Sequence, residues 1–168
     1  MTPRCAFAVL LLAPSLALAQ PPPVDTAAST PLTRTAAQAG LLSCAARIEQ
    51  VSRFLGAGNQ MAFQLSLPQP PRDLRMAGAA MEITPPAGAS SYASAQFAAA
   101  GRGCDAIYQT VTYWPAPCAE IAATRFPGQA PGLPLGPAIT TLELGGNARI
   151  FLMPAGTTGC ISIKTDRI

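Results

Sequence analysis

The stretch Cys104–Phe126, CDAIYQTVTYWPAPCAEIAATRF, decides the fold of this chain. Its alternating bulky residues predict a strand over 104–114, and the Pro-Ala-Pro that follows cannot extend that strand. Pro117 suits the first turn of a helix, so we expect a helix over 118–125 that ends before the next proline. Both faces of the strand carry bulk, which is typical of a central strand in a sheet.

The segments on either side predict one more helix and six more strands. Apolar residues in steps of four and three, behind a Thr35/Gln38 capping box, predict an amphipathic helix over 35–55 with Cys44 in the middle of its buried stripe. Period-two alternation between turn residues predicts the other strands, at 60–67, 75–84, 91–99, 139–144, 149–153 and 161–165. The expected fold is α+β: a mainly antiparallel sheet of about six to seven strands with two helices packed on one face.

Two segments are expected to precede the folded domain. Residues 1–19 contain Arg4, an apolar run and a small-x-small sequence, which together are typical of a signal peptide cleaved after Ala19. Residues 20–34 are rich in Pro, Ala and Thr without apolar periodicity, so we expect a disordered leader. The domain, residues 35–168, is then periplasmic or secreted, with no membrane span after signal cleavage. The Ala, Pro, Gly and Arg richness indicates a bacterial source.

Four cysteines remain after signal cleavage, and in an exported chain they predict two disulfides. Cys104 and Cys118 should not pair, because a strand of about ten residues at ~3.3 Å per residue holds them roughly 30 Å apart. A bridge needs Cα atoms within roughly 7 Å. We favour Cys44–Cys118 with Cys104–Cys160, which joins the two helices and two strand starts. The alternative is Cys44–Cys104 with Cys118–Cys160.

The composition argues against several classes of site. The chain has no histidine, which removes the commonest general base, and no CxxC spacing, so we expect neither a metal nor a cofactor. The net charge is +3 and the basic residues are scattered, so no nucleic-acid partner is expected. Two catalytic alternatives remain: a Ser162/Lys164 dyad on the last strand, and a carboxylate pair drawn from single acids such as Asp105, Glu120 and Glu143.

Aromatic residues of the 104–114 strand are the candidate binding residues. Tyr108 and Trp114 share one face of this strand, and the other face carries Ile107, Val111 and Tyr113. If that second face packs under the helices, Tyr108 and Trp114 lie on the open side of the sheet, and Arg102 and Arg125 rim them. Exposed aromatics anchor protein interfaces. The alternative is that these aromatics fill the core beneath a helix.

These observations predict a small exported, disulfide-bonded domain without enzymatic activity. We expect it to bind another macromolecule, such as an envelope protein or a cell-wall enzyme, through the open face of its sheet. One alternative is a carboxylate-dependent hydrolase of envelope glycans, and another is a purely structural envelope component. A cleft with two carboxylates about 5 to 10 Å apart would favour the hydrolase, and a flat exposed aromatic patch would favour binding.

Overall fold

In the computed structural model, which describes residues 29–101 and 103–168, three α-helices lie against an eight-stranded sheet. The predicted signal peptide, most of the predicted leader and Arg102 lie outside the described residues. The helices are α1 (Pro31–Gln38), α2 (Ala45–Gly56) and α3 (Cys118–Arg125), with a 3-10 turn at Arg72–Leu74. The strands are β1 (Gln60–Ser66), β2 (Ala77–Thr84), β3 (Ser91–Ala100), β4 (Gly103–Trp114), β5 (Ala130–Pro131), β6 (Thr140–Glu143), β7 (Arg149–Ala155) and β8 (Gly159–Arg167). Within these ranges, no helix is long and apolar enough to cross a membrane.

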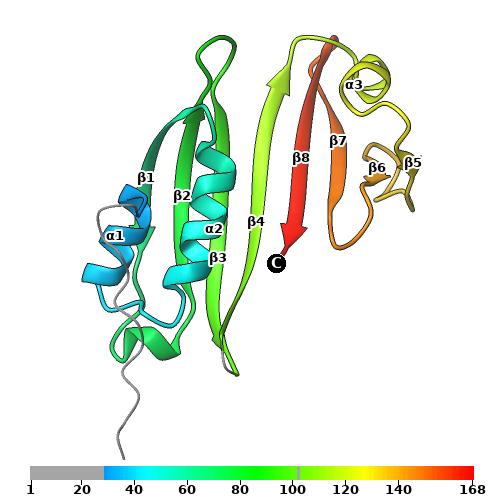
Figure 1. Cartoon of the computed structure of the whole chain (residues 1–168). Helices are drawn as coiled ribbons and strands as arrows, with labels where there is room; N and C mark the ends of the chain where they lie inside the picture. The colour runs from blue at the N-terminus through cyan, green and yellow to red at the C-terminus, as the bar shows by residue number, and fades with distance from the viewer. Residues whose placement is uncertain (1–28, 102) are drawn as a thin grey trace, which may run out of the picture.

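The strands follow the order β1-β2-β3-β4-β8-β7-β6-β5, and every neighbouring pair is antiparallel. The chain builds β1–β4 as a meander, passes through α3 to the far edge, and returns so that β8 lies beside β4 (Figure 1). Hairpin connections build each half, and the β4–β8 pair joins the halves. The α+β class and the antiparallel sheet are confirmed, whereas the predicted numbers of strands and helices were too low.

The α1 helix begins inside the predicted leader. Thr30 caps it, because its hydroxyl accepts a hydrogen bond from the Thr33 N–H, and Pro31 occupies the first turn. The predicted capping box at Thr35 is wrong, since the Thr35 hydroxyl instead donates to the Pro31 carbonyl at 3.0 Å within the helix. Ordered structure therefore extends further toward the N-terminus than the predicted domain boundary at residue 35.

A glycine turn separates α1 from α2, so the single helix predicted over 35–55 is wrong. Gly40 has a φ of +88°, and its N–H donates to the Ala37 carbonyl at 2.9 Å. The Leu41 N–H donates to the Ala36 carbonyl at 3.0 Å, which completes a Schellman-type helix end. The turn restarts the chain as α2, and Cys44 lies at the N-terminus of that helix instead of in the middle of a longer one.

Two hydrophobic cores lie between the helices and the sheet. The N-terminal core packs α1 and α2 on β1–β4, and its floor contains Phe97 surrounded by small residues: Ala77, Ala79, Ala93, Ala95 and Ala106. These small side chains leave room for α2 against the sheet, and they give β3 a sequence of mostly Ala and Ser with little of the bulk that strands usually carry. The C-terminal core packs α3 on β6–β8 through Ile121, Leu142, Ile150, Leu152 and Cys160.

One disulfide ties each core together. Cys44 bonds Cys104 of β4, and Cys118 bonds Cys160 of β8, with Cα atoms 5.0 Å apart in both bridges. The favoured pairing, Cys44–Cys118 with Cys104–Cys160, is therefore wrong, and the alternative pairing is formed. The reason is that α2 begins at the Cys104 end of β4, whereas Cys118 follows the opposite end of that strand. The exclusion of a Cys104–Cys118 bridge is confirmed.

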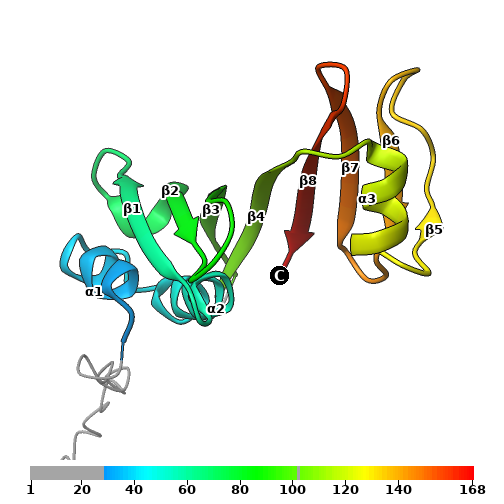
Figure 2. The same cartoon turned by 90° about the horizontal axis from the view of Figure 1, so that it is seen from above.

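All three helices lie on the same face of the sheet. Cys104 and Trp114 lie an even number of positions apart along β4, so they share one strand face, and Trp114 is paired directly with Cys160. The two disulfides therefore attach α2 and α3 to the same face. Figure 2 shows α1 beside α2 on that side of the β1–β4 half. The predicted packing of the helices on one face is confirmed.

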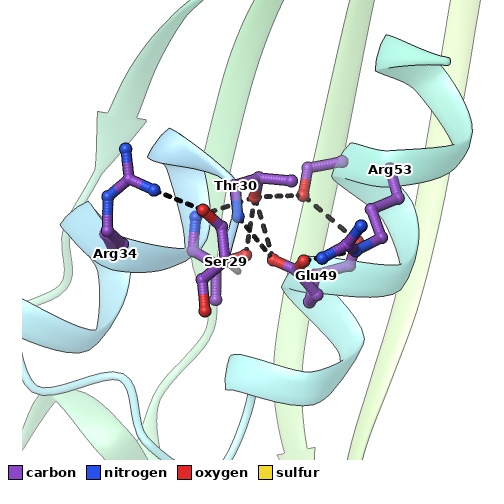
Figure 3. Close-up of polar contacts among 7 residues, drawn as sticks. Ser29, Thr30, Arg34, Glu49 and Arg53 are labelled. Atoms are coloured by element: carbon purple, nitrogen blue, oxygen red, sulfur yellow. Dashed lines mark hydrogen bonds and ion pairs between the residues drawn. The ribbon is translucent and has the colours of Figure 1, made fainter. Parts of the chain in front are cut away.

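A cluster of hydrogen bonds fixes α1 against α2 (Figure 3). The Glu49 carboxylate accepts from the Thr30 N–H at 2.9 Å and the Thr30 hydroxyl at 3.1 Å, and it forms an ion pair with Arg53. The Thr30 hydroxyl also bonds the Ser52 hydroxyl at 2.7 Å. Burial acts to raise the pKa of Glu49, but the hydrogen bonds from Thr33, Thr30 and Arg53 outweigh it and hold that pKa below its usual value.

Candidate binding surface

The face of the sheet opposite the helices carries a cluster of apolar side chains at its centre. Two lines of directly paired residues cross it: Tyr92–Val111–Ile163–Phe151 over β3, β4, β8 and β7, and Tyr113–Ile161–Met153 over β4, β8 and β7. We call these seven residues the open-face patch. All of them are at least partly exposed, and Tyr92 and Tyr113 are 52% and 53% exposed. A contiguous apolar surface of this kind is typical of an interaction site.

Alternation along two central strands positions this patch. In β8, Ile161 and Ile163 alternate with Cys160, which packs in the C-terminal core with Ile121 of α3, and with the buried Ser162. The two isoleucines therefore point away from the helices. In β4, Tyr113 alternates in the same way with Trp114, which packs against the C-terminal core. Both strands are therefore apolar on both faces at this point, and only one of those faces is covered by helices.

The Tyr113 ring is positioned by the absence of a side chain at Gly159 of β8. A Cβ atom at Gly159 would lie 2.7 Å from the Tyr113 Cε2 atom and 2.8 Å from its hydroxyl oxygen. The ring thus occupies the space that any larger residue at Gly159 would need. An aromatic ring already held on the sheet loses little conformational entropy when a partner covers it.

Polar residues border the open-face patch toward the C-terminal end of β8. The next line of paired residues across the sheet is Gln109, Thr165 and Arg149. The Arg149 guanidinium forms an ion pair with the Glu143 carboxylate at 3.1 Å. A polar rim around an apolar centre is the usual anatomy of a protein interface.

Two hollows lie at this end of the sheet, and the first of them is lined by the rim residues Arg149 and Thr165. Their volumes are about 310 Å³ and 210 Å³, and Ile107 and Arg167 line both. Among the described residues that line them, Asp105 is the one carboxylate. These hollows therefore do not supply the two facing carboxylates that glycoside hydrolysis requires.

Tyr108 lies on the helix-bearing face, so its conditional placement on the open side is wrong, and the alternative that it fills the core beneath a helix is the one observed. Its side chain is 3% exposed, its hydroxyl donates to the Asp166 carboxylate at 3.0 Å, and its ring centroid is 5.7 Å from that of Phe54 on α2. Burial, with the Asp166 carboxylate adding to it, raises the pKa of the Tyr108 phenol. The physical reason for the placement is that Tyr108 shares its strand face with Cys104, which is bonded to Cys44 at the start of α2.

Trp114 also lies on the helix-bearing face, where the structure brings it together with Arg125. Its indole N–H donates to the Ser162 hydroxyl at 2.8 Å, and the Arg125 guanidinium carbon lies 4.9 Å from its ring centroid. The two residues belong to the border of the C-terminal core instead of an open patch. Arg102 lies outside the described residues, so the structure does not place it.

The residues of the two catalytic alternatives have other partners or lie apart. Ser162 and Lys164 share a face of β8, but the Ser162 hydroxyl accepts from Trp114 and the Lys164 ammonium lies 5.3 Å from the Phe54 ring centroid. The single acids lie on separate elements: Asp105 on β4, Glu120 on α3 and Glu143 on β6. In the part of the chain that the structure describes, no group of three or more His, Cys, Asp or Glu side chains is arranged to hold a metal ion.

Sequence reasoning named Val111 and Tyr113 but assigned them to the covered face. The other members of the open-face patch (Tyr92, Phe151, Met153, Ile161 and Ile163) were not singled out. Alternation in the sequence could have grouped these residues on one face of their strands. It could not have shown whether helices cover that face or leave it exposed.

Comparisons of this chain with protein-family models, curated proteins and solved structures find no match.

Proposed function

We propose that this chain is an exported binding domain that recognises another exported protein, such as an envelope protein or a cell-wall enzyme, through the open-face patch. One observation carries the proposal. Seven partly exposed apolar residues occupy the centre of a sheet face on which none of the described helices lies, and two of them are tyrosines that are half exposed. Leaving such a surface in water is unfavourable, and covering it with a partner removes that cost.

Export is supported by the two disulfides, since such bonds persist in oxidising compartments such as the bacterial periplasm. The signal-peptide pattern of residues 1–19 supports the same compartment. The partner would therefore be met outside the cytoplasm.

The composition of the surface supports a protein partner. Tyrosine is enriched among the residues that dominate binding energy, and here Tyr92 and Tyr113 flank a group of aliphatic side chains. The Arg149–Glu143 ion pair at the rim is exposed and contributes to orientation more than to affinity. Binding of this kind requires no catalytic group, in keeping with a non-enzymatic role.

Site-specific photo-crosslinking in cells that make the protein tests the proposal. The photoreactive residue p-benzoylphenylalanine replaces Tyr113, and the matched control places it at Phe54 on α2. The two positions have aromatic side chains of similar exposure, 53% and 57%, on opposite faces of the molecule. We expect a discrete covalent adduct with one protein from position 113 and none from position 54.

A second change links the adduct to the patch. Ile163→Lys places an ammonium group at the centre of the patch, where Val111 and Phe151 are its direct neighbours, and it should abolish the adduct. Circular dichroism verifies that this variant is folded. Equal adducts from both positions, or an adduct from position 113 that survives Ile163→Lys, would contradict the proposal.

A further inference from the structure

The two edges of the sheet differ in how they are protected against pairing with another strand. At one edge, β5 has two residues and one of them is Pro131, which cannot donate a ladder hydrogen bond. At the other edge, β1 has seven residues and pairs one-to-one with β2 along its whole length. It has no bulge, no proline and no charged side chain. Charge, proline, bulges and short length are the usual means of blocking an edge, and β1 has none of them.

The backbone of β1 is available on its outer side. Among the described residues, the backbone groups of Gln60–Ser66 form no backbone hydrogen bond outside the sheet, and β2 is the sole strand beside β1. Figure 2 shows α1 out of the plane of the sheet, on the helix-bearing side beside α2, where it reaches partly past β1 without lying in line with the strands. Its buried residues, Leu32 and Ala36, belong to the N-terminal core. The α1 helix therefore leaves the place of a further strand unfilled by any described element.

The core-facing side chains of β1 are incompletely covered. Met61, Phe63 and Leu65 pack against the N-terminal core but remain partly exposed. Their paired residues on β2, such as Met81 and Ile83, are buried. The difference arises because β2 has a strand on each side and β1 has a strand on one side only.

The sequence of β1 is complementary to itself in antiparallel pairing about Phe63. Met61 would face Leu65 of the other copy on the core side, and Gln60 would face Ser66 on the open side. On the core side apolar residues then meet apolar ones. On the open side Gln60 meets Ser66 and the small Ala62 lies beside Gln64, so no bulky apolar side chain opposes a polar one and no like charges are opposed. Such pairing has two-fold symmetry, the commonest symmetry of homo-oligomers.

We propose that two copies of this chain pair antiparallel through β1, so that their sheets join into one and Met61, Phe63 and Leu65 of each copy are covered by the other. The two-fold axis runs perpendicular to the joined sheet. Both open-face patches therefore face the same direction, and the dimer presents them to a partner as a bivalent surface.

Analytical ultracentrifugation of the processed protein with two charge variants tests this proposal. Gln60→Lys with Ser66→Lys places lysine opposite lysine at both ends of the shared ladder. Gln60→Lys with Ser66→Glu places lysine opposite glutamate at the same positions. Within one copy, Gln60 faces Thr84 and Ser66 faces Gly78, so neither variant opposes like charges inside its own sheet. Both positions are exposed, and circular dichroism verifies the fold.

We expect a dimer for the wild type, a dissociation constant about tenfold higher for the lysine–lysine variant, and a value equal to or below that of the wild type for the lysine–glutamate variant. A wild type that stays monomeric up to about 100 µM, where a Kd of that size would leave much of it paired, overturns the proposal. So does a dimer that both variants leave unchanged. If Ile163→Lys alone dissociates the dimer, the second copy covers the open-face patch and not β1. The crosslinking experiment at Tyr113 has its own readout, so failure of the β1 dimer leaves that test unaffected.

Discussion

Trp114 of β4 donates its indole N–H to the hydroxyl of Ser162 on β8 at 2.8 Å, across the strand pair that joins the two halves of the sheet. In the register of these two strands Trp114 lies opposite Cys160, and Cys160 forms the disulfide with Cys118 at the start of α3. The same short stretch of β4 and β8 thus supports the C-terminal core on one face and Tyr113 of the open-face patch on the other. Changes on the covered side of this stretch should be transmitted to the binding surface.

Ser162→Ala should lower the free energy of unfolding by about 1 kcal/mol, because it removes the acceptor of a partly buried indole N–H. Urea unfolding measures this loss, and the tryptophan emission of the native state should shift because the chain contains one Trp. Ser94→Ala on β3 serves as the control and should change the unfolding free energy by less, because among residues 29–101 and 103–168 the Ser94 hydroxyl has no such partner across the sheet. Equal losses of unfolding free energy in the two variants would show that the Trp114–Ser162 hydrogen bond does not stabilise the fold.

Removing the Cys118–Cys160 bridge with the double variant Cys118→Ala/Cys160→Ala should release α3 selectively. Ile121 is the one residue of this helix that is buried, so the disulfide carries much of its attachment. The bridge has a sequence separation of 42, for which the chain-entropy model gives about 4 kcal/mol.

Hydrogen exchange followed by mass spectrometry should show loss of protection in α3 while α2 stays protected. The matched variant Cys44→Ala/Cys104→Ala should loosen α2 and leave α3 protected. Loss of protection spread evenly over both helices in either variant would show that the two cores are not separate.

Glu49 should stabilise the α1–α2 contact in a pH-dependent way. Its pKa in the folded protein lies below the ordinary value of 4.5, so its contribution is fully present above that pH and is lost as the pH falls through the folded-state pKa. The difference in unfolding free energy between the wild type and Glu49→Gln should therefore be largest at pH 6 to 7 and shrink in acid. Glu82→Gln on the open face is the control, and a difference for Glu49→Gln that grows on acidification would contradict this assignment.

Gly40→Ala should destabilise the protein by about 1 kcal/mol, because a left-handed conformation costs an L-residue roughly 1–2 kcal/mol. The φ of Gly40 is +88°, and apart from its chain neighbours no described residue comes within 4 Å of a Cβ placed there, so backbone strain is the cost and not a clash. Gly103→Ala on β4 is the matched control: its Cβ would also meet open space, but its φ is not in the left-handed region. Thermal unfolding should separate the two variants, and identical midpoints would rule out this role for Gly40.

Local patterns in the sequence determined most of the secondary structure. The helix over 118–125 has the predicted bounds, because Pro117 and Pro127 limit it by steric effects within a few residues. The strand at Gln60–Ser66 was predicted from strict alternation, which requires no knowledge of the partner strand. The division of the first helical segment was missed although its cause is local, since the Ala-Gly-Leu end of α1 is a Schellman sequence around Gly40.

The disulfide pairing and the identity of the open face were decided by the tertiary structure, and both follow from where α2 packs on the sheet. Alternation placed Cys104, Tyr108 and Trp114 on the same side of β4, but a strand with bulk on both sides does not specify which side the helices cover. The packing of α2 over the alanine floor of β2–β4 settles it, by bringing Cys44 to Cys104 and leaving Tyr113 in water. That packing depends on contacts between residues far apart in the chain, which local periodicity does not contain.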